Sequence, residues 1–369
     1  MKIGVPSEIK PQENRVALTP GNAKSLVNKG HQVFVQSGAG KGSSYFDEEY
    51  IAAGVIMLPD APAVFGETET IVKVKEPQPS ELQMLTKDHC LFTYLHLAAS
   101  SELTRGLLDT GCTSIAYETV ETSAKRLPLL EPMSEIAGSM STLVGSYHLA
   151  NHRGGRGILP GGVTGVAPGR VVVIGGGTSG VNAARIATGI GADVTILEVD
   201  TERMRFLDIT MSGAHTLYSS EANLAEILPR VDLVIGAVLI PGAAAPKLIT
   251  REMLRLLQPG SVLVDIAVDQ GGCAETTRPT THDAPTFEEE GVVHYCVANM
   301  PGAYSRTATQ ALNNATFRYL LEIAEKGPLN ALRENPALMH GLSTLGGHLT
   351  SEPVSLATNI PYTAAETLF

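Results

Sequence analysis

The segment VVVIGGGTSGVNAARIATGIGADVTILEVD, residues 171–200, restricts the possible folds of this 369-residue chain more than any other stretch. Gly175, Gly177 and Gly180 stand in G-x-G-x-x-G spacing between a run typical of a buried strand and a run typical of a helix. The first glycine permits a tight turn, the second lets the backbone approach a pyrophosphate, and the third lets the helix pack on the strand. The N-terminus of the helix favours an anion. The segment therefore predicts a dinucleotide-binding βαβ unit, with a ligand-free glycine-rich turn as the alternative.

The end of the following strand indicates which dinucleotide is bound. The following strand, DVTILEVD, carries Glu198 at a position where a carboxylate accepts a hydrogen bond from a ribose 2′-hydroxyl and repels a 2′-phosphate. NAD is therefore favoured over NADP. Asp200 is the competing candidate for the ribose contact, and Arg203 and Arg205, which follow closely, weaken the preference.

Short β-branched runs alternate with helix-like segments along the whole chain. The strands expected in the first part are KIGVP, HQVFVQS, TIVKVKEP, CLFTYLHL and TSIAYETV, with helices near 20–29, 47–53, 79–86 and 100–110. A second series of expected strands is RVVVIGG, DVTILEVD, HTLYSS, DLVIGAVLI, SVLVDIAV and VVHYCVANM. Strands that are apolar on both faces and separated by helices indicate parallel sheets covered on both sides. The chain is therefore expected to be an α/β protein with two Rossmann-like, doubly wound parallel-sheet domains.

Two segments bear on the domain boundaries. Residues 151–170 are rich in glycine and proline, and we interpret them as a structured surface loop in preference to a flexible linker. The apolar stripe in 308–327 predicts a long helix ended by Gly327 and Pro328. A helix in this place is expected to cross back to the first domain. The expected domains are thus 1–130 plus about 305–369, for substrate and catalysis, and 131–304, a Rossmann domain for NAD.

Composition excludes several classes of protein. No apolar run approaches the roughly 18 residues of a membrane span, and no signal peptide is recognisable in the first residues. The four cysteines are scattered without metal-site or disulfide spacing, as in a reducing cytoplasm. The formal net charge of −11 argues against a nucleic-acid surface. We therefore expect a cytoplasmic protein without nucleic-acid or membrane partners.

Four ionisable residues stand out in otherwise apolar segments. Arg15 lies in QENRVALTP, and Lys75 ends IVKVKEP, with Lys73 expected on the same face unless the strand breaks. His96 ends its strand, and Asp269 ends SVLVDIAVD. Each has a simpler interpretation: a surface loop charge, a solvated strand end, a hydrogen-bonded core histidine, and a helix cap or turn residue.

Beside a nicotinamide site, these four side chains match the needs of amino-acid oxidation by hydride transfer. The α-carboxylate requires cations, and proton transfer requires a group with a pKa near neutrality, which is typical of histidine. A carboxylate would orient and balance these groups. Their combination favours an enzyme over a non-catalytic NAD-binding protein of the same fold.

A series of short segments then carries a more specific resemblance. In order they are IGVPSEIKPQENRVALTP, IVKVKEP, FTYLHLA, YETV, LPLLEPMSEIAG, VVVIGGG, IGAVLIPG, VDIAVDQGGC and ANMPGA. Together they resemble the alanine dehydrogenase family up to about residue 315, after which the match weakens. The alternative is the NAD-binding subunit of a proton-translocating transhydrogenase. That subunit is similar in fold and in its RVALTP-type segment, but it lacks the histidine of FTYLHLA.

The resemblance implies the activity and the site. NAD would be the cofactor, no metal would be needed, and L-alanine would be deaminated reversibly to pyruvate and ammonia in an interdomain active-site cleft. Arg15 and Lys75 would bind the substrate, and His96 and Asp269 would be catalytic. The implied cofactor contacts, beside the three glycines, are Ser134, Thr178, Glu198, Arg203, Ser220, Val238, Leu239, Ile266, Ala267, Val268, Asp269, Arg278, Val297, Ala298, Asn299 and Met300.

The resemblance also implies a homohexamer, and the sequence departs from the family in three places. Glu198 replaces the usual Asp at the ribose position, Ser139 stands where a basic residue is expected, and PGAYSRTAT varies the loop after ANMPGA. These departures concern loop details and the packing of an oligomer, and they leave the expected chemistry unchanged.

Overall fold

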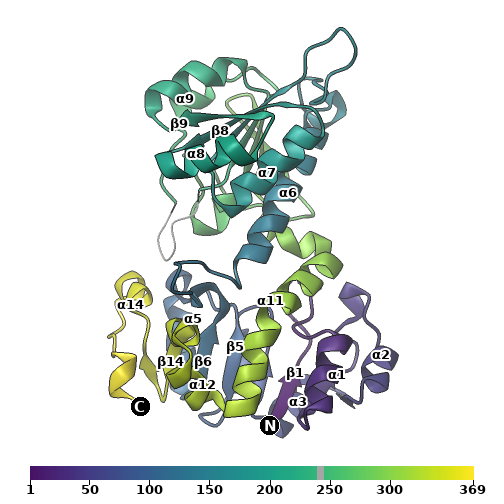
Figure 1. Ribbon diagram of the computed structural model, residues 1–369, viewed down its shortest axis with the longest axis vertical. Coiled ribbons are helices and arrows are strands. Elements are labelled where there is room, and N and C mark those ends of the chain that lie inside the picture. Colours follow the sequence, from purple (N-terminus) through teal and green to yellow (C-terminus); the bar gives the residue numbers. More distant parts are fainter. Residues whose placement is uncertain (239–244) are drawn as a thin grey trace. The chain divides into compact units, whose positions relative to one another are not determined.

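The computed structural model describes residues 1–238 and 245–369, which form two compact units (Figure 1). Unit 1 comprises Met1–Met133 and Gly302–Phe369, and unit 2 comprises Ser134–Pro301. The junctions expected from the sequence lie at 130/131 and near 305. The N-terminal and C-terminal parts of unit 1 are joined through one β-sheet.

The sheet of unit 1 has the strand order β15-β14-β6-β5-β4-β1-β2-β3. Its strands are β1 (Lys2–Val5), β2 (Gln32–Gln36), β3 (Ile56–Leu58), β4 (Thr70–Val72), β5 (Cys90–Thr93), β6 (Thr113–Ala116), β14 (Leu342–Leu345) and β15 (His348–Leu349). Strands β1 to β6 pair in parallel, whereas β14 pairs antiparallel with β6 and β15 antiparallel with β14. The expected parallel sheet is confirmed for β1 to β6, and the C-terminal tail extends it at the β6 edge with the two antiparallel strands β14 and β15.

The helices of unit 1 begin and end at local sequence signals. They are α1 (Pro20–Asn28), α2 (Asp47–Ala52), α3 (Ala61–Glu67), α4 (Pro79–Leu82), α5 (Ser101–Thr110), α11 (Ser305–Lys326), α12 (Pro328–Glu334), α13 (Pro336–Gly341) and α14 (Glu352–Thr358). The Thr19 hydroxyl caps α1 by accepting from the N–H of Asn22, and Ser100 caps α5 in the same way. The expected helices near 20–29, 47–53, 79–86 and 100–110 are confirmed, although α4 ends early. The long helix expected in 308–327 is α11, which ends at Gly327 as predicted.

The sheet of unit 2 has the strand order β12-β13-β11-β10-β7-β8-β9. Its strands are β7 (Arg170–Ile174), β8 (Asp193–Glu198), β9 (Ala214–Tyr218), β10 (Leu233–Gly236), β11 (Val262–Asp265), β12 (Thr286–Glu289) and β13 (Val292–Tyr295). Its main helices are α6 (Glu131–His148, which begins in unit 1), α7 (Thr178–Gly189), α8 (Thr201–Thr210), α9 (Glu221–Ile227) and α10 (Arg251–Leu254). All pairings are parallel except that of the edge strand β12, which was not expected.

Both faces of the unit 2 sheet are covered, as the apolar strands predict. On β7, Val171 and Val173 belong to one buried cluster, whereas Val172 and Ile174 belong to another. Successive side chains of a strand point to opposite faces, so each cluster fills one side of the sheet. This double burial explains why the strand reads as a continuous apolar run.

The glycine- and proline-rich stretch 151–170 is a structured loop, which confirms the interpretation preferred from the sequence. Gly157 donates its N–H to the carbonyl of Leu149, and Gly169 donates to that of Pro160. Arg156 binds Asp232 at 2.8 Å, which ties the loop to the start of β10.

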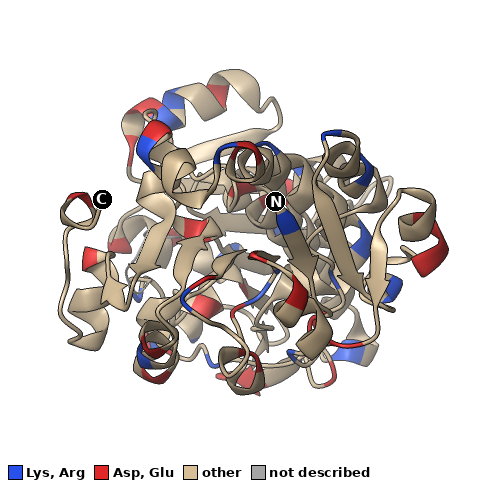
Figure 2. Cartoon of the chain, turned by 90° about the horizontal axis from the view of Figure 1, so that it is seen from below, with Lys and Arg blue, Asp and Glu red and all other residues tan. Residues whose placement is uncertain are grey.

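Charged residues occur along the whole chain, whereas the cysteines lie in the interior. Basic and acidic segments are interspersed along the chain in the view of Figure 2. All four cysteines are buried and unbridged. Within residues 1–238 and 245–369, none of the helices combines the length and the apolar character that crossing a membrane would require.

Candidate active site

Three of the singled-out residues in unit 1 follow neighbouring strands of its sheet. Arg15 comes after β1, Lys75 after β4 and His96 after β5. Strands β1, β4 and β5 are adjacent and parallel, so their carboxyl ends meet at one edge of the sheet. Ligands of open α/β sheets bind at this edge. The topology of unit 1 therefore supports a common site for the three side chains.

Arg15 is a buried cation, and the interpretation as a surface loop charge is wrong. Its guanidinium is 2% exposed and binds Glu13 through two hydrogen bonds, Nε to Oε1 at 2.7 Å and Nη2 to Oε2 at 2.5 Å. Nη1 donates to the sulfur of Met133 at 3.0 Å. Burial disfavours the charged form, but the Glu13 carboxylate outweighs it and raises the pKa of Arg15. The side chain is therefore a permanent, oriented positive charge.

The two lysines after β4 have different environments. The strand ends at Val72, so Lys73 and Lys75 do not share a face as a continuous strand would require. The ammonium of Lys73 is buried and contacts Glu81 at 2.7 Å and Glu8 at 3.2 Å. Lys75 lies two residues further along the chain and is 8% exposed. Only Lys75 remains a candidate for binding a substrate.

His96 is exposed, so the interpretation as a core histidine is wrong. It adopts a left-handed conformation (φ 50°, ψ 37°) that turns the chain away from β5. Its backbone N–H donates to Oε1 of Glu118 at 2.6 Å, and the same carboxylate accepts the N–H of Leu95. The imidazole stacks on the ring of Tyr94 with a centroid distance of 5.8 Å. These contacts hold an accessible imidazole at the carboxyl edge of the sheet.

The glycine loop of unit 2 has the geometry that its spacing predicts. Gly175 has φ 102°, and a Cβ atom there would lie 2.9 Å from the carbonyl oxygen of Ala237. A Cβ atom on Gly180 would lie 1.8 Å from the carbonyl oxygen of Gly175, so the helix can pack this closely only with glycine. At Gly177 a Cβ atom would meet nothing within 4 Å, and no side chain caps α7 there. The described residues thus leave open space beside Gly177, the N-cap residue of α7.

Glu198 and Arg203 bind the two backbone polar groups of one loop residue, Gly176. Oε2 of Glu198 accepts the N–H of Gly176 at 2.8 Å, and Nε of Arg203 donates to the carbonyl of Gly176 at 2.7 Å. Asp200, the competing ribose candidate, caps α8 by accepting two backbone N–H groups. Arg205 forms an ion pair with the exposed carboxylate of Glu202. Glu198 is therefore the carboxylate that lies at the glycine loop.

Asp269 lies in the short 3-10 helix Ile266–Gln270 that follows β11, and its side chain is exposed. Its Oδ2 accepts the N–H of Asn299 at 3.4 Å, which brings the loop after β13 to it. The helix-capping role proposed as the simple alternative belongs to Asp265, whose carboxylate accepts the N–H of Ala267 at 3.0 Å. Asp269 remains a candidate for chemistry at the carboxyl edge of the unit 2 sheet.

The other expected cofactor residues fall into three groups. Thr178 begins α7, and Ser134 lies on α6, whereas Ser220 caps α9 by accepting the N–H of Asn223 at 3.2 Å. The guanidinium of Arg278 lies 4.0 Å from the ring centre of Phe287. The remaining side chains are buried or partly buried: Val238, Ile266, Ala267, Val268, Val297, Ala298, Asn299 and Met300. Leu239 lies outside the described residues.

Three carboxylates that the sequence analysis did not single out organise these segments. They are Glu8, which accepts from the segment carrying Lys75, Glu118, which holds His96, and Asp265, which holds the loop carrying Asp269. Each binds backbone N–H groups just beyond a strand. The only local signal was an acidic residue within or beside an apolar run, as in VLVDIAV.

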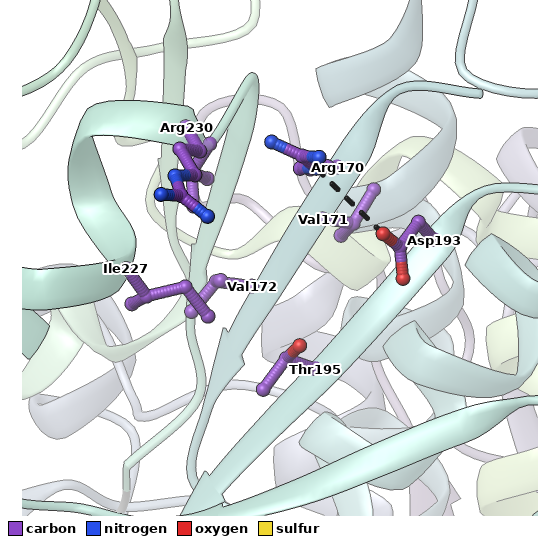
Figure 3. A pocket seen from close by; sticks show the side chains of 8 residues that line it. Arg170, Val171, Val172, Asp193, Thr195, Ile227 and Arg230 are labelled. Carbon is purple, nitrogen blue, oxygen red and sulfur yellow. Dashed lines mark ion pairs between the residues drawn. The ribbon is translucent and has the colours of Figure 1, made fainter. Parts of the chain in front are cut away.

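A hollow of about 220 Å³ in unit 2 is unrelated to these groups. It is lined by Arg170, Asp193, Thr195 and Arg230, among others, and Arg170 pairs with Asp193 at 3.7 Å (Figure 3). Arg170 and Asp193 are the first residues of β7 and β8. The hollow therefore lies at the amino ends of the strands, opposite the edge that carries the glycine loop.

Known proteins similar to this chain cover its whole length. Residues 4–137 match the family "Alanine dehydrogenase/PNT, N-terminal domain", and residues 141–352 match "Alanine dehydrogenase/PNT, C-terminal domain". A relative from Methanococcus maripaludis, named alanine dehydrogenase, is 54% identical over 99% of both chains. A solved structure of L-alanine dehydrogenase covers 97% of this chain and 99% of its own, with 48% identity and a TM-score of 0.93. A transhydrogenase structure from Sinorhizobium meliloti has 26% identity and a TM-score of 0.82, and the match covers 95% of this chain and 99% of that one.

Proposed function

The chain belongs to the alanine dehydrogenase/PNT family, and we propose that it catalyses the NAD-dependent, reversible oxidative deamination of L-alanine to pyruvate and ammonia. The observation that carries this proposal is the sequence identity of 52–54%, over 99% of this chain, to relatives named alanine dehydrogenase. The cations and the imidazole at the carboxyl edge of unit 1 supply the side chains that the reaction needs. On the resemblance alone, we add a homohexameric assembly and a cytoplasmic location.

Unit 2 is the proposed NAD-binding domain, and its glycine loop fits a dinucleotide. The open space at Gly177 and the uncapped N-terminus of α7 suit a pyrophosphate. Glu198, already at the loop, would hold the ribose and disfavour a 2′-phosphate. When bound, NAD⁺ supplies the acceptor for the hydride from the substrate Cα. The other proposed contacts are those named from the family resemblance.

In unit 1, Arg15 and Lys75 would bind the carboxylate of L-alanine. Two cations suit a carboxylate because charge-assisted hydrogen bonds are strong and directional. Arg15 is held rigidly by Glu13, so little motion has to be lost when the substrate binds. Their proposed role is to fix the orientation of the Cα hydrogen.

His96 is the proposed acid and base. L-Alanine reacts as its neutral amine, after the α-ammonium group has released a proton. Hydride loss from Cα then leaves an iminium, to which water adds while the imidazole takes up a proton. Transfer of a proton to the nitrogen then lets ammonia leave and forms the carbonyl of pyruvate. Asp269 is the proposed second catalytic residue. Each turnover consumes L-alanine, NAD⁺ and water and gives pyruvate, ammonium, NADH and one proton.

The alternative is the NAD-binding subunit of a transhydrogenase, which the structural match to such a protein favours. It would bind NADH without oxidising L-alanine. The exposed His96 argues against it, because an amino-acid dehydrogenase needs a proton-transfer group and hydride exchange between nucleotides does not.

The test is NADH formation by the purified protein with NAD⁺ and L-alanine at alkaline pH, with D-alanine as the control. NADH formation with L-alanine alone supports the proposal. His96→Ala should lower the rate in both directions by about 10²-fold or more. The matched control His348→Ala removes an exposed histidine of the same unit and should leave the rate unchanged. NADH binding without L-alanine oxidation would establish the alternative, and an active His96→Ala would remove the imidazole from the mechanism.

A further inference from the structure

We propose that Glu8 is the positioning residue of Lys75, with Lys73 as its counter-charge, and that this arrangement sets the affinity for the substrate carboxylate. The inference rests on the proposed function of Lys75 and assigns roles to two residues outside that proposal. It also explains why two lysines stand two positions apart after β4.

One carboxylate binds three successive residues. Oε1 of Glu8 accepts the N–H of Val74 at 2.6 Å, and Oε2 accepts the N–H of Lys75 at 3.3 Å. Oε2 also contacts the ammonium of Lys73 at 3.2 Å. The side chain of Glu8 is only 3% exposed, so water does not compete for these bonds.

The backbone needs these bonds because β4 ends at Val72. Buried N–H groups beyond a strand end must find other acceptors. On the other side of the segment, the carbonyl of Val74 accepts the N–H of Tyr94 at 3.2 Å, and the carbonyl of Lys75 accepts the Thr93 hydroxyl at 2.9 Å. The N–H groups of Val74 and Lys75 therefore face Glu8, whereas their carbonyls face the end of β5. Bound on both sides, the backbone of Lys75 has a fixed position.

Lys73 balances the charge of this arrangement. Its ammonium is 1% exposed and lies between Glu8 and Glu81, and Glu81 also accepts the N–H of Gln78 at 2.8 Å. Burial raises the pKa of Glu8, and the Lys73 cation opposes this rise. A buried cation with two carboxylate partners is not available to a substrate. The Lys73 cation thus favours the ionised form of Glu8, and this form can accept from all three donors.

Glu8→Gln is the decisive variant, because the charge of the remaining Lys73–Glu81 pair stays balanced and the fold should persist. The amide oxygen can still accept from Val74, but the amide nitrogen then points donors at the N–H of Lys75. We expect the KM for L-alanine to rise about tenfold with kcat changed less than about threefold, the pattern of lost ground-state binding. The Kd for NADH should stay within about twofold.

The matched control is Glu325→Gln, which removes an exposed carboxylate of the same unit that pairs with Lys29 at 2.6 Å. It should leave KM, kcat and the NADH Kd unchanged. Glu8→Asp keeps the charge but shortens the reach to both N–H groups, so it gives the same test if Glu8→Gln does not fold. Its KM should also rise.

The outcomes separate this inference from the proposed function. An unchanged KM in a folded Glu8 variant of an active enzyme would overturn the positioning role and leave the function intact. A parallel loss of NADH binding would also overturn it, because the effect would then not be specific to the substrate. If the unaltered protein forms no NADH from L-alanine, the proposed function itself fails.

Discussion

In each unit a buried carboxylate at or just after the end of a strand binds the backbone of a segment of the proposed site. The charge of this carboxylate is balanced differently in the two units. In unit 1, Glu8 accepts from the backbone beside Lys75 and contacts the cation of Lys73. In unit 2, Asp265 accepts the N–H groups of Ala267 and Cys273 and the hydroxyl of Thr277. All three of these donors to Asp265 are neutral groups. Unit 1 should therefore be sensitive to charge and unit 2 to hydrogen-bond geometry.

Lys73→Met should have the largest effect on stability. It leaves the carboxylates of Glu8 and Glu81 buried without their cation, and the expected loss is about 3–5 kcal/mol in the free energy of unfolding. Urea unfolding can be followed by tyrosine fluorescence, because the chain has no tryptophan. Lys29→Met, which removes the exposed partner of Glu325, should change the free energy by less than about 1 kcal/mol. Equal effects of the two substitutions would contradict the proposed sensitivity of unit 1 to charge.

Asp265→Asn should lower the free energy of unfolding by a smaller amount, about 1–3 kcal/mol. The amide keeps one oxygen that can accept from the N–H groups and replaces the other oxygen by a donor. The side chain is fully buried, so solvent cannot replace the lost acceptor. The same urea experiment measures this cost, and Asn223→Asp on the surface helix α9 provides the control. A loss as large as that of Lys73→Met would show that unit 2 also depends on charge.

The dependence of stability on pH should have opposite signs for one carboxylate of each unit, Glu8 and Glu290. These changes in the free energy of unfolding should be smaller than those of the substitutions above. Burial raises the pKa of Glu8 above its ordinary value of 4.5, so the folded state binds a proton at Glu8 more tightly than the unfolded state does. The contribution of this proton to the free energy of unfolding is lost as pH rises through the pKa of the folded state. Hydrogen bonds from Arg255 and Arg251 lower the pKa of Glu290 to about 2. Its contribution is present above pH 4.5 and is lost as pH falls towards 2.

Urea unfolding at several pH values, with Glu8→Gln and Glu290→Gln, isolates these two contributions. Relative to Glu8→Gln, the unaltered protein should lose stability as pH rises above 4.5. Relative to Glu290→Gln, it should lose stability as pH falls below 4.5. Slopes of the same sign would contradict the assignment of causes, which are burial for Glu8 and ion pairing for Glu290.

The sequence predicted the features that depend on short stretches of chain. The spacing of Gly175, Gly177 and Gly180 was sufficient for the turn, because each glycine acts within one βα connection. Alternating apolar runs were sufficient for most strands and helices. The pairing of β14 with β6 was not predictable, because it joins residues more than two hundred positions apart.

The candidate site was predicted less completely than the fold. Arg15, Lys75 and His96 were recognisable as charges in apolar segments, but the burial of Lys73 depends on where β4 ends. The roles of Glu8 and Asp265 depend on backbone donors that only the folded chain brings to them. A carboxylate that binds backbone N–H groups leaves no periodic signal in the sequence.

The central claim is that unit 1 binds the substrate and unit 2 binds the nucleotide. The most direct measurement is the NADH Kd of Lys75→Ala, made beside its turnover of L-alanine. We expect turnover to fall by about 10²-fold or more while the NADH Kd stays within about twofold. If nucleotide binding collapses together with turnover, Lys75 does not act on the substrate alone and the division between the two units is contradicted.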